Sequence, residues 1–442
     1  MSSPNFTSTC NPRADLRSTR RSLPWLMAAL LLIPAAAWAD ADATTAPHPP
    51  PLTLQECYAL ALKRSEEIAI HQEQIAETTG RLLQTVSGLL PRASFNLSEK
   101  RQDGSGGSAF TLKEVPERKF VFSQPLFSGF KEFAALAGSR AERRQRTHEK
   151  RRAEQLLFLD VTDAFYLRLE QEEDLQALAA THDALTERLK ELADRQRLGR
   201  SRVSEVASAT AQLKRLEAEV ERVRSLETTA HQLLAFLTGL EHSGALEDAI
   251  PTLPSLDDEA QYAAMAGMRP DVQAAAEAWR VAERAVTVAK AKFWPTVDLE
   301  GNYYEKRAGA ASGVDWDMTL KVDAPIFQGG QVVGSVKEAA ARAREAQLQF
   351  ARTQRLAELD IRETHAKLRA DTARTAALQK ALEASVENYR LQAEDYKLSL
   401  VSNLEVLQAL QALQDARREF LHAQYETKRL YWQLQVATGQ TL

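Results

Sequence analysis

The eight histidines are the side chains best suited to bind a metal or to move a proton at neutral pH, yet their spacing supports neither role. The chain contains no HExxH, paired CxxC, GxSxG or Walker sequence to place a zinc ion, a nucleophile or a phosphate. We therefore predict no metal, no cofactor and no enzymatic activity. The histidines are expected to be solvated helix residues: His48, His71, His148, His182, His231, His242, His365 and His422.

The glycine-rich segment Asp103–Ser108 resembles a phosphate-binding loop only superficially. It lacks the following lysine and the strand-to-helix setting, so we predict an external loop. The two cysteines are equally uninformative: Cys10 lies in a segment expected to be removed, which leaves Cys57 without a disulfide partner. We expect Cys57 to be inert packing.

Positive charges are densest from Arg140 to Arg152, where Glu142 and Glu149 interrupt them. A solvated helix face is favoured over a polyanion site, although a position just beneath a membrane would let this run meet anionic lipid. The net charge is −4 and becomes −7 without residues 1–39, which hold four Arg and one Asp. We therefore exclude a general nucleic-acid-binding protein.

The N-terminus has the pattern of a secretory signal peptide. Arg17, Arg20 and Arg21 precede a mostly apolar run, and Ala37-Trp38-Ala39 fits a cleavage site. We predict a signal peptide over 1–39, of the ordinary rather than the twin-arginine kind, and an extended lead-in over 40–51. No later apolar run approaches the ~20 residues of a membrane-spanning helix.

The elements that must position any site occur twice. Blocks without proline, 126–250 and 326–442, are rich in helix-forming residues, and matching residues recur at an offset of 200. We predict repeats over 52–240 and 257–442, joined by a linker over 241–256. The matching pairs are Pro125 and Pro325, Phe127 and Phe327, Gly129 and Gly329, Leu198 and Leu398, Glu205 and Glu405, Val206 and Val406, and Thr238-Gly239 and Thr438-Gly439.

Each repeat is expected to run helix, strand, strand, long helix, returning helix, with the first helix of the second repeat over about 257–293. A heptad pattern in the returning helices is typical of helices that pack side by side. From the helices alone we favour an antiparallel coiled-coil rod. The predicted strands lie at about 92–101, 118–125, 295–305 and 314–324, the long helices at about 128–196 and 329–396, and the returning helices at about 204–238 and 404–438.

The strands change this interpretation, because they alternate apolar and polar residues. A soluble hairpin would show the same alternation. One apolar face is expected to meet lipid at Val314, Trp316, Met318, Leu320 and Val322. Trp294, Trp316, Tyr303 and Tyr304 are candidates for an interfacial aromatic belt. Four strands cannot close a barrel, so a membrane position requires two, three, four or more chains together.

The signal peptide, the duplicated plan, Pro-Leu-Phe-Ser-Gly at 125–129, Pro-Ile-Phe-Gln-Gly-Gly at 325–330 and the terminal Thr-Gly pairs together resemble the TolC-like outer-membrane efflux protein family. The resemblance implies a mainly α fold with a small β part. Three chains would form a 12-stranded outer-membrane β-barrel continued by a 12-helix periplasmic α-barrel.

The function implied is a passive exit duct in the outer membrane of a Gram-negative bacterium, for efflux or type I secretion. Its partners would be a periplasmic adaptor and an inner-membrane transporter of the RND, MFS or ABC class, with outer-membrane lipid around it. The alternative is a periplasmic coiled-coil scaffold or adaptor without a pore.

The resemblance also assigns residues. Glu205, Tyr396, Glu405 and Gln408 would form the periplasmic gate, with Glu405 as a carboxylate ring that favours cations. Alternatively, Glu205 and Glu405 only begin their helices. Val401 stands where relatives have an arginine. The adaptor-contacting tips are Leu198, Gly199, Ser201, Val203, Leu398, Ser399, Val401 and Leu404. The joint between strands and helices is Pro125, Gly129, Pro325, Gly329 and Gly330, where proline is expected to end the strand ladder.

Overall fold

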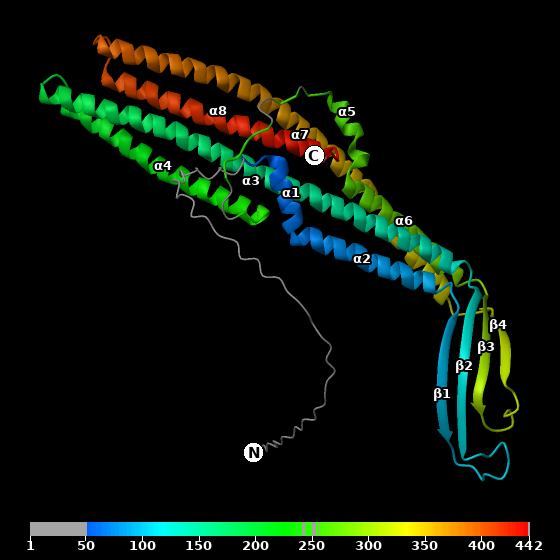
Figure 1. The fold of residues 1–442 in the computed structure, drawn as a ribbon. Coiled ribbons are helices and arrows are strands. Elements are labelled where there is room, and N and C mark those ends of the chain that lie inside the picture. The colour runs from blue at the N-terminus through cyan, green and yellow to red at the C-terminus, as the bar shows by residue number, and fades with distance from the viewer. Residues whose placement is uncertain (1–50, 241–243, 250–252, 255, 441–442) are drawn as a thin grey trace, which may run out of the picture. The chain divides into compact units, whose positions relative to one another are not determined.

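The computed structural model describes residues 51–240, 244–249, 253–254 and 256–440, all within one unit, Pro49–Leu442 (Figure 1). The predicted signal peptide over 1–39 lies outside the described residues, as does nearly all of the predicted lead-in. The described residues are mostly helical with one small antiparallel sheet, so the predicted fold class, mainly α with a small β part, is confirmed.

Four helices dominate: α3 (Lys131–Arg197) and α7 (Gln331–Lys397), each of 67 residues, and the returning α4 (Val203–Thr238) and α8 (Asn403–Ala437). At 1.5 Å per residue, 67 residues span about 100 Å. Both long helices begin two or three residues later than predicted. The reason is positive φ at Gly129 and Phe130, and at Gly329 and Gly330, which a right-handed helix cannot contain.

Shorter helices precede the strands in each repeat: α1 (Leu54–Arg64) and α2 (Glu66–Ser87), then α5 (Glu259–Ala264), η1 (Ala266–Met268) and α6 (Pro270–Ala291). The single helix expected over 257–293 is therefore wrong. Proline lacks an N–H donor and suits the first position of a helix, so Pro270 starts α6 instead of lying inside a longer helix.

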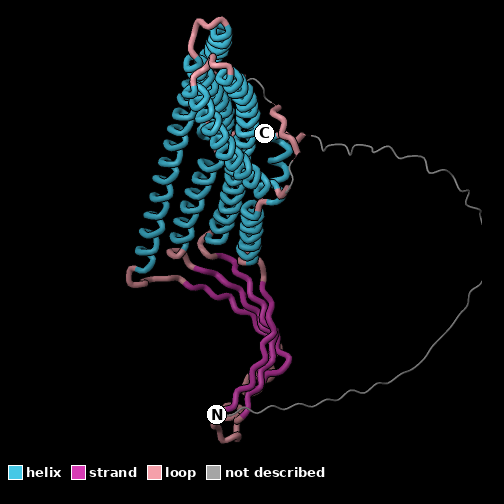
Figure 2. Tube along the Cα trace, turned by 90° about the vertical axis from the view of Figure 1, so that its left-hand side faces the viewer, coloured by secondary structure: helices cyan, strands magenta, loops and turns pink. Residues whose placement is uncertain are grey.

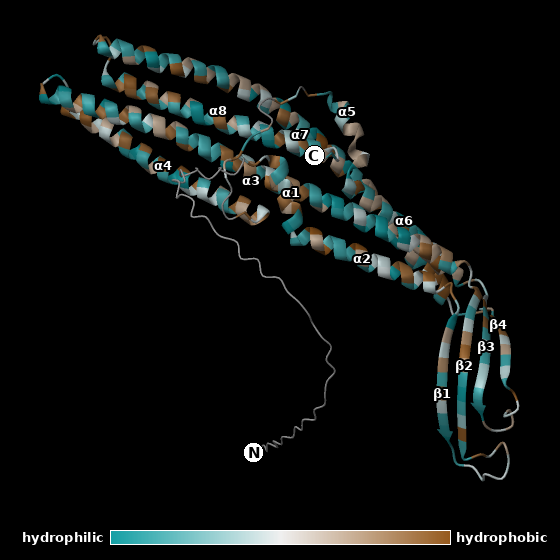
Figure 3. Ribbon diagram, in the orientation of Figure 1, coloured by the Kyte–Doolittle hydropathy of each residue, from teal (hydrophilic) through white to brown (hydrophobic). Residues whose placement is uncertain are grey.

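The helices lie side by side in a row whose members change along its length (Figures 1 and 2). Near the strands, α3 contacts α2 and α6, and α6 contacts α7; near the turns, α3 contacts α4 and α8, and α8 contacts α7. Buried side chains occur along most of α3, whereas those of α7 are confined to Val332, 357–368 and Tyr396. Accordingly, α3 lies inside the row and α7 at its edge. Figure 3 shows these long helices as mostly hydrophilic, with scattered hydrophobic patches.

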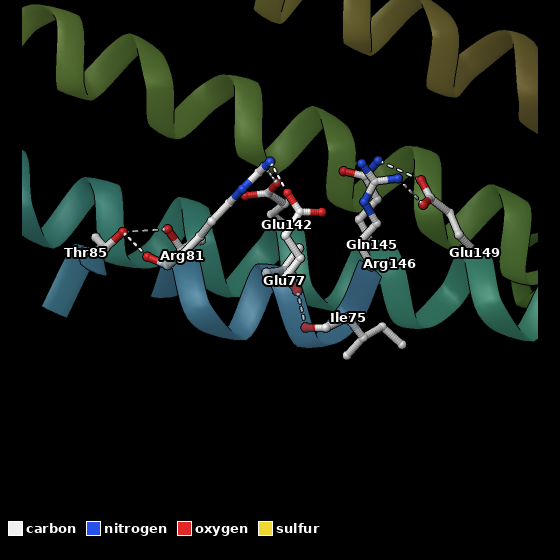
Figure 4. A network of polar contacts seen from close by, with 10 residues as sticks. Ile75, Glu77, Arg81, Thr85, Glu142, Gln145, Arg146 and Glu149 are labelled. Atoms are coloured by element: carbon white, nitrogen blue, oxygen red, sulfur yellow. Dashed lines mark hydrogen bonds and ion pairs between the residues drawn. The ribbon is translucent and has the colours of Figure 1, made fainter. Parts of the chain in front are cut away.

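The basic run Arg140–Arg152 lies on α3, and many of its charges are paired rather than free. Arg144 pairs with Glu277 of α6 at 2.8 Å, and Arg152 lies 4.0 Å from Asp271. Figure 4 shows the adjoining network, in which Arg81 of α2 contacts Glu142 of α3. The run therefore ties α3 to its neighbours, which is more than the solvated face that the sequence predicts.

The sheet has the order β1-β2-β3-β4 with every neighbouring pair antiparallel, and its strands extend from one end of the helices (Figure 2). The strands are β1 (Arg92–Arg101), β2 (Glu114–Phe127), β3 (Thr296–Arg307) and β4 (Trp316–Asp323). β2 begins four residues before the predicted 118, because Glu114–Glu117 also pair with β1.

Three expectations for the strands are wrong. Pro125 does not end its ladder: it pairs with Asp298 inside β2, and a register shift after it absorbs the missing N–H donor. Val314 is not in a strand, because its N–H donates to the carbonyl of Ala311 in the turn before β4. Tyr304 is also not part of the proposed aromatic belt. Its hydroxyl donates at 2.8 Å to Asp317 on the polar face of the sheet, opposite the face that carries Tyr303 and Trp316.

Among the described residues, buried apolar side chains form three clusters along the helices. One joins α1, α3, α4 and α8 around Phe158, Phe165 and Trp432, and includes Cys57. Burial raises the pKa of the Cys57 thiol to about 11, which keeps it protonated and agrees with an inert packing role. None of the described helices is both apolar and long enough to span a bilayer.

Candidate functional site

The two helical hairpins turn in the same way at their tips. Two residues after the end of each long helix the backbone is left-handed, at Gly199 with φ 69° after α3 and at Ser399 with φ 59° after α7. The next residue then donates back to the helix, from Arg200 N to the carbonyl of Arg195 at 2.8 Å and from Leu400 N to that of Asp395 at 2.9 Å. Ser201 and Val401 are half-buried, and the other predicted tip residues are exposed.

Substitutions at the two left-handed positions should have opposite effects on stability. Gly199→Ala should lower the free energy of unfolding by about 1 kcal/mol, because a Cβ is strained at positive φ. Nothing lies within 4 Å of the added Cβ, so no clash contributes. Ser399→Gly should raise it by about 0.5 kcal/mol by removing the same strain. Urea unfolding of both variants checks this pair, and equal signs would contradict the assignment.

Glu205 and Glu405 occupy the same place in α4 and α8, in the first helical turn. The N–H of Ser402 donates to Glu405 Oε2 at 2.6 Å, and the Ser201 hydroxyl donates to Glu205. Hydrogen bonds from the backbone and hydroxyl of Ser402 lower the pKa of Glu405, so it is charged at neutral pH. Both carboxylates thus cap their helices, as the alternative interpretation held, and Glu405 is also exposed. Gln408 is exposed three residues further along α8.

Tyr396 is buried beneath an arginine that the sequence did not identify. The Arg188 guanidinium of α3 lies 3.6 Å from the centre of the Tyr396 ring, and its Nε donates to Asn403 Oδ1 of α8 at 3.1 Å. Arg188 Nη1 also donates to Glu191 at 2.8 Å. Arg188 therefore ties one hairpin to both helices of the other; we call Arg188, Tyr396 and Asn403 the tip clamp. Within the described residues, Tyr396 has no hydrogen bond to Glu205.

Apolar packing surrounds the tip clamp. Leu185 and Leu192 of α3, Val406 and Leu410 of α8, and Tyr396 belong to one buried cluster. Val401 packs against this cluster, which is the physical role of an apolar residue at that position. The two hairpins of one chain therefore meet through both an apolar core and a charged contact.

A signal for the tip clamp does exist in the sequence, in the differences between the repeats. At the offset of 200, Arg188 is matched by Asn388, Tyr396 by Gln196, and Asn403 by Val203. All three clamp residues occur at positions where the repeats differ, whereas Glu205 and Glu405 match. Residues that match between the repeats therefore indicate the fold that both repeats share. Residues that differ include those that form the contact between the two hairpins.

The sheet presents one continuous apolar face. Cross-strand partners place Phe95 opposite Phe120, Phe120 opposite Tyr303, and Tyr303 opposite Trp316; we call these four residues the aromatic row. The predicted lipid-facing residues of β4 are each at least 60% exposed: Trp316, Met318, Leu320 and Val322. The opposite face is polar, as where Asn302 donates to Asp317 at 2.8 Å.

The joint depends on one glycine in particular. A Cβ at Gly129 would lie 2.7 Å from the carbonyl of Ala291 and 2.9 Å from Cβ of Trp294, and φ there is 67°. Gly329 and Gly330 have positive φ but open surroundings. A second aromatic group adjoins this joint, with ring centres 5.4 Å apart for Phe127 and Phe130 and 6.5 Å apart for Phe127 and Trp294.

No group of three or more metal-ligating side chains occurs in the part of the chain that the structure describes. The tips, the strands and the joint offer contacts, charge and an apolar surface.

The chain is similar in sequence and in structure to known outer-membrane proteins. Outer membrane protein TolC of Vibrio cholerae serotype O1 is 21% identical over 433 residues, which cover 95% of both chains. The structure of outer membrane protein VceC from Vibrio cholerae has a TM-score of 0.76 at 20% identity, covering 88% of this chain and 96% of that chain. A membrane protein from Pseudomonas aeruginosa has a TM-score of 0.79 at 17% identity, covering 88% and 90%. The two structural matches establish the fold.

The family described as outer membrane efflux protein matches residues 57–240 and 263–440, which are the two predicted repeats nearly in full. Its members are channel proteins of the Gram-negative outer membrane rather than enzymes. With both repeats matched and the fold shared, this chain belongs to the outer membrane efflux protein family.

Proposed function

We propose that three copies of the chain form a passive exit duct, with strands crossing the outer membrane and helices extending into the periplasm. The observation that carries the proposal is the sheet, which has one apolar and one polar face and two unpaired edges, β1 and β4. Unpaired backbone groups are costly in lipid, so these edges must pair with neighbouring copies. Three copies of a four-stranded sheet would supply the twelve strands of one closed barrel.

The helices support the same assembly. At each level a chain contributes four helices in a row, with α7 at one edge and α2 or α4 at the other. Both edges expose large apolar side chains, which a neighbouring copy would cover. They are Leu348, Leu356 and Leu359 on α7, and Leu226, Leu233 and Phe236 on α4.

The tips would contact a periplasmic adaptor, and through it an inner-membrane transporter of the RND, MFS or ABC class. Leu198, Val203, Leu398 and Leu404 are exposed apolar residues at the end of the hairpins, where a partner helix can pack on them. The tip clamp, Glu205, Glu405 and Gln408 would form the gate.

Planar-bilayer recording of the purified protein tests the duct. We expect stable single-channel conductance and an oligomer on gels that dissociates on heating. A water-soluble monomer without conductance would contradict the duct and would support a periplasmic scaffold or adaptor without a pore.

Glu405→Ala should reduce the cation selectivity of the closed duct. Glu405 is exposed and charged, so three copies around the axis would attract cations. We expect the ratio of cation to anion permeability to fall about twofold or more, measured from reversal potentials in asymmetric salt. Glu338→Ala, on α7 far from the tip and paired with Arg342, is the matched control. An unchanged reversal potential would remove Glu405 from the constriction.

A further inference from the structure

The length of the apolar face can be counted in residues along β2. On β2, seven residues separate Phe120 of the aromatic row from Phe127, whose ring contacts Phe130 and Trp294 at the joint. At ~3.3 Å per residue this length along the strand is about 23 Å, which a strand tilt of about 35–45° reduces to roughly 16–19 Å across a bilayer, within the ~25 Å apolar band of outer-membrane barrels. The aromatic row and the joint aromatics therefore lie near the two ends of the apolar face, and a residue two positions beyond the row lies near the boundary of the band.

Two positive charges lie directly beyond the aromatic row. Arg118 is two residues from Phe120 on β2, hence on the same face, and its cross-strand partner on β3 is Lys306. Like charges opposite one another destabilise a sheet. Both side chains are exposed, and neither has an ion pair among the described residues.

Nearby carboxylates do not neutralise this pair in the structure. Glu117 contacts Lys119 at 3.0 Å, and Glu114 lies 3.6 Å from Arg101. A register shift between Arg118 and Lys119 leaves Glu305 without a cross-strand partner on β2. An unmatched cationic pair thus remains at the level where lipid headgroups would begin.

We infer that Arg118 and Lys306 bind phosphate groups of the phosphorylated glycolipid in the outer leaflet. This inference rests on the proposed function, because it takes the sheet to cross the outer membrane. An arginine fork and a lysine ammonium are complementary to a phosphate, which would remove the repulsion between them. Leu97, the partner of Arg118 on β1, and Phe120 supply apolar contact for the acyl chains below the phosphate.

The test compares binding of phosphorylated and dephosphorylated lipid A to the purified oligomer in detergent, by native mass spectrometry. Each cation near an anionic lipid contributes roughly fivefold in affinity, so the wild type should prefer the phosphorylated form about tenfold or more. The double variant Arg118→Gln/Lys306→Gln should reduce the preference to about twofold or less. Lys321→Gln is the matched control, because Lys321 is a cation on the polar face of the same sheet.

Equal binding of both lipids by the wild type, or an unchanged preference in the double variant, would overturn the inference. Competition by inorganic phosphate at millimolar concentration would also overturn it, by indicating a site for free phosphate. Bilayer conductance separates the two proposals. A conducting channel without lipid preference refutes only the lipid site, whereas an absence of conductance refutes the duct itself.

Discussion

Arg269→Ala should lower the free energy of unfolding by about 2 kcal/mol, because it removes the buried arginine that bonds two carboxylates of different helices, Asp271 at 28% and Asp360 at 52% side-chain exposure. Arg269 is 5% exposed and donates to Asp271 Oδ2 at 2.8 Å and to Asp360 Oδ2 at 2.6 Å. Asp360 is on α7 and Asp271 is in the first turn of α6, while Arg152 of α3 lies 4.0 Å from Asp271. The cluster therefore holds α3, α6 and α7 together at one point along their length.

The measurement is urea unfolding in detergent, with Arg362→Ala as the matched control. Arg362 is on the same helix as Asp360 and pairs with Glu259 at 3.8 Å, but both side chains are about half exposed. An exposed pair contributes roughly 0–1 kcal/mol, so this control should change little. Equal losses in the two variants would contradict a special role for the buried cluster.

The cluster also predicts a pH dependence. Burial alone would raise the pKa of Asp271, but hydrogen bonds from Arg269 and the charge of Arg152 outweigh it and lower the pKa below the usual 3.8. A lowered carboxyl pKa stabilises the fold above the unfolded value, and this contribution is lost as the pH falls through the folded value. Wild-type stability should thus fall on acidification below about pH 3.8, and less steeply in Arg269→Ala.

The order of the long helices and strands could be predicted because it depends on local rules. Proline-free blocks of helix formers gave α3, α4, α7 and α8, and alternation gave the four strands. The predictions failed at two prolines. Pro125 stays in β2 because a register shift accommodates it, and Pro270 divides one predicted helix because it suits a helix start.

The candidate site was predictable only in part. Glu205 and Glu405 came from a family resemblance, and both are placed in the first turn of their helices. Periodicity cannot indicate which helices become neighbours across 200 residues, so it did not pair Arg188 with Tyr396. Arg118 and Lys306 were missed for the same reason: their opposition depends on strand register, which no single strand specifies.

Arg188→Ala should both destabilise the tips and open the proposed gate. The variant loses a cation–π contact with Tyr396 and a charged hydrogen bond to Asn403, together worth about 2–4 kcal/mol per chain. The side chain of Arg188 is only 14% exposed, so water replaces these contacts poorly. Opening of the proposed gate would separate the hairpins, so a loss of ~2 kcal/mol should favour the open over the closed state roughly thirtyfold.

Single-channel recording measures this shift as a higher conductance or open probability, and urea unfolding reports the stability separately. Arg195→Ala is the matched control: like Arg188 it pairs with Glu191 at 2.8 Å, but it lies 4.8 Å from the centre of the same ring and is more exposed. We expect a smaller change from it.

Conservative variants separate gating from folding. Tyr396→Phe keeps the aromatic ring beneath Arg188 and should conduct like the wild type, whereas Tyr396→Leu should resemble Arg188→Ala. Arg188→Lys keeps the charge but lacks the planar fork that bonds Asn403 while stacking on the ring, so it should be intermediate. If Arg188→Ala lowers stability and leaves conductance unchanged, the tip clamp supports the fold and the gate lies elsewhere at the tips.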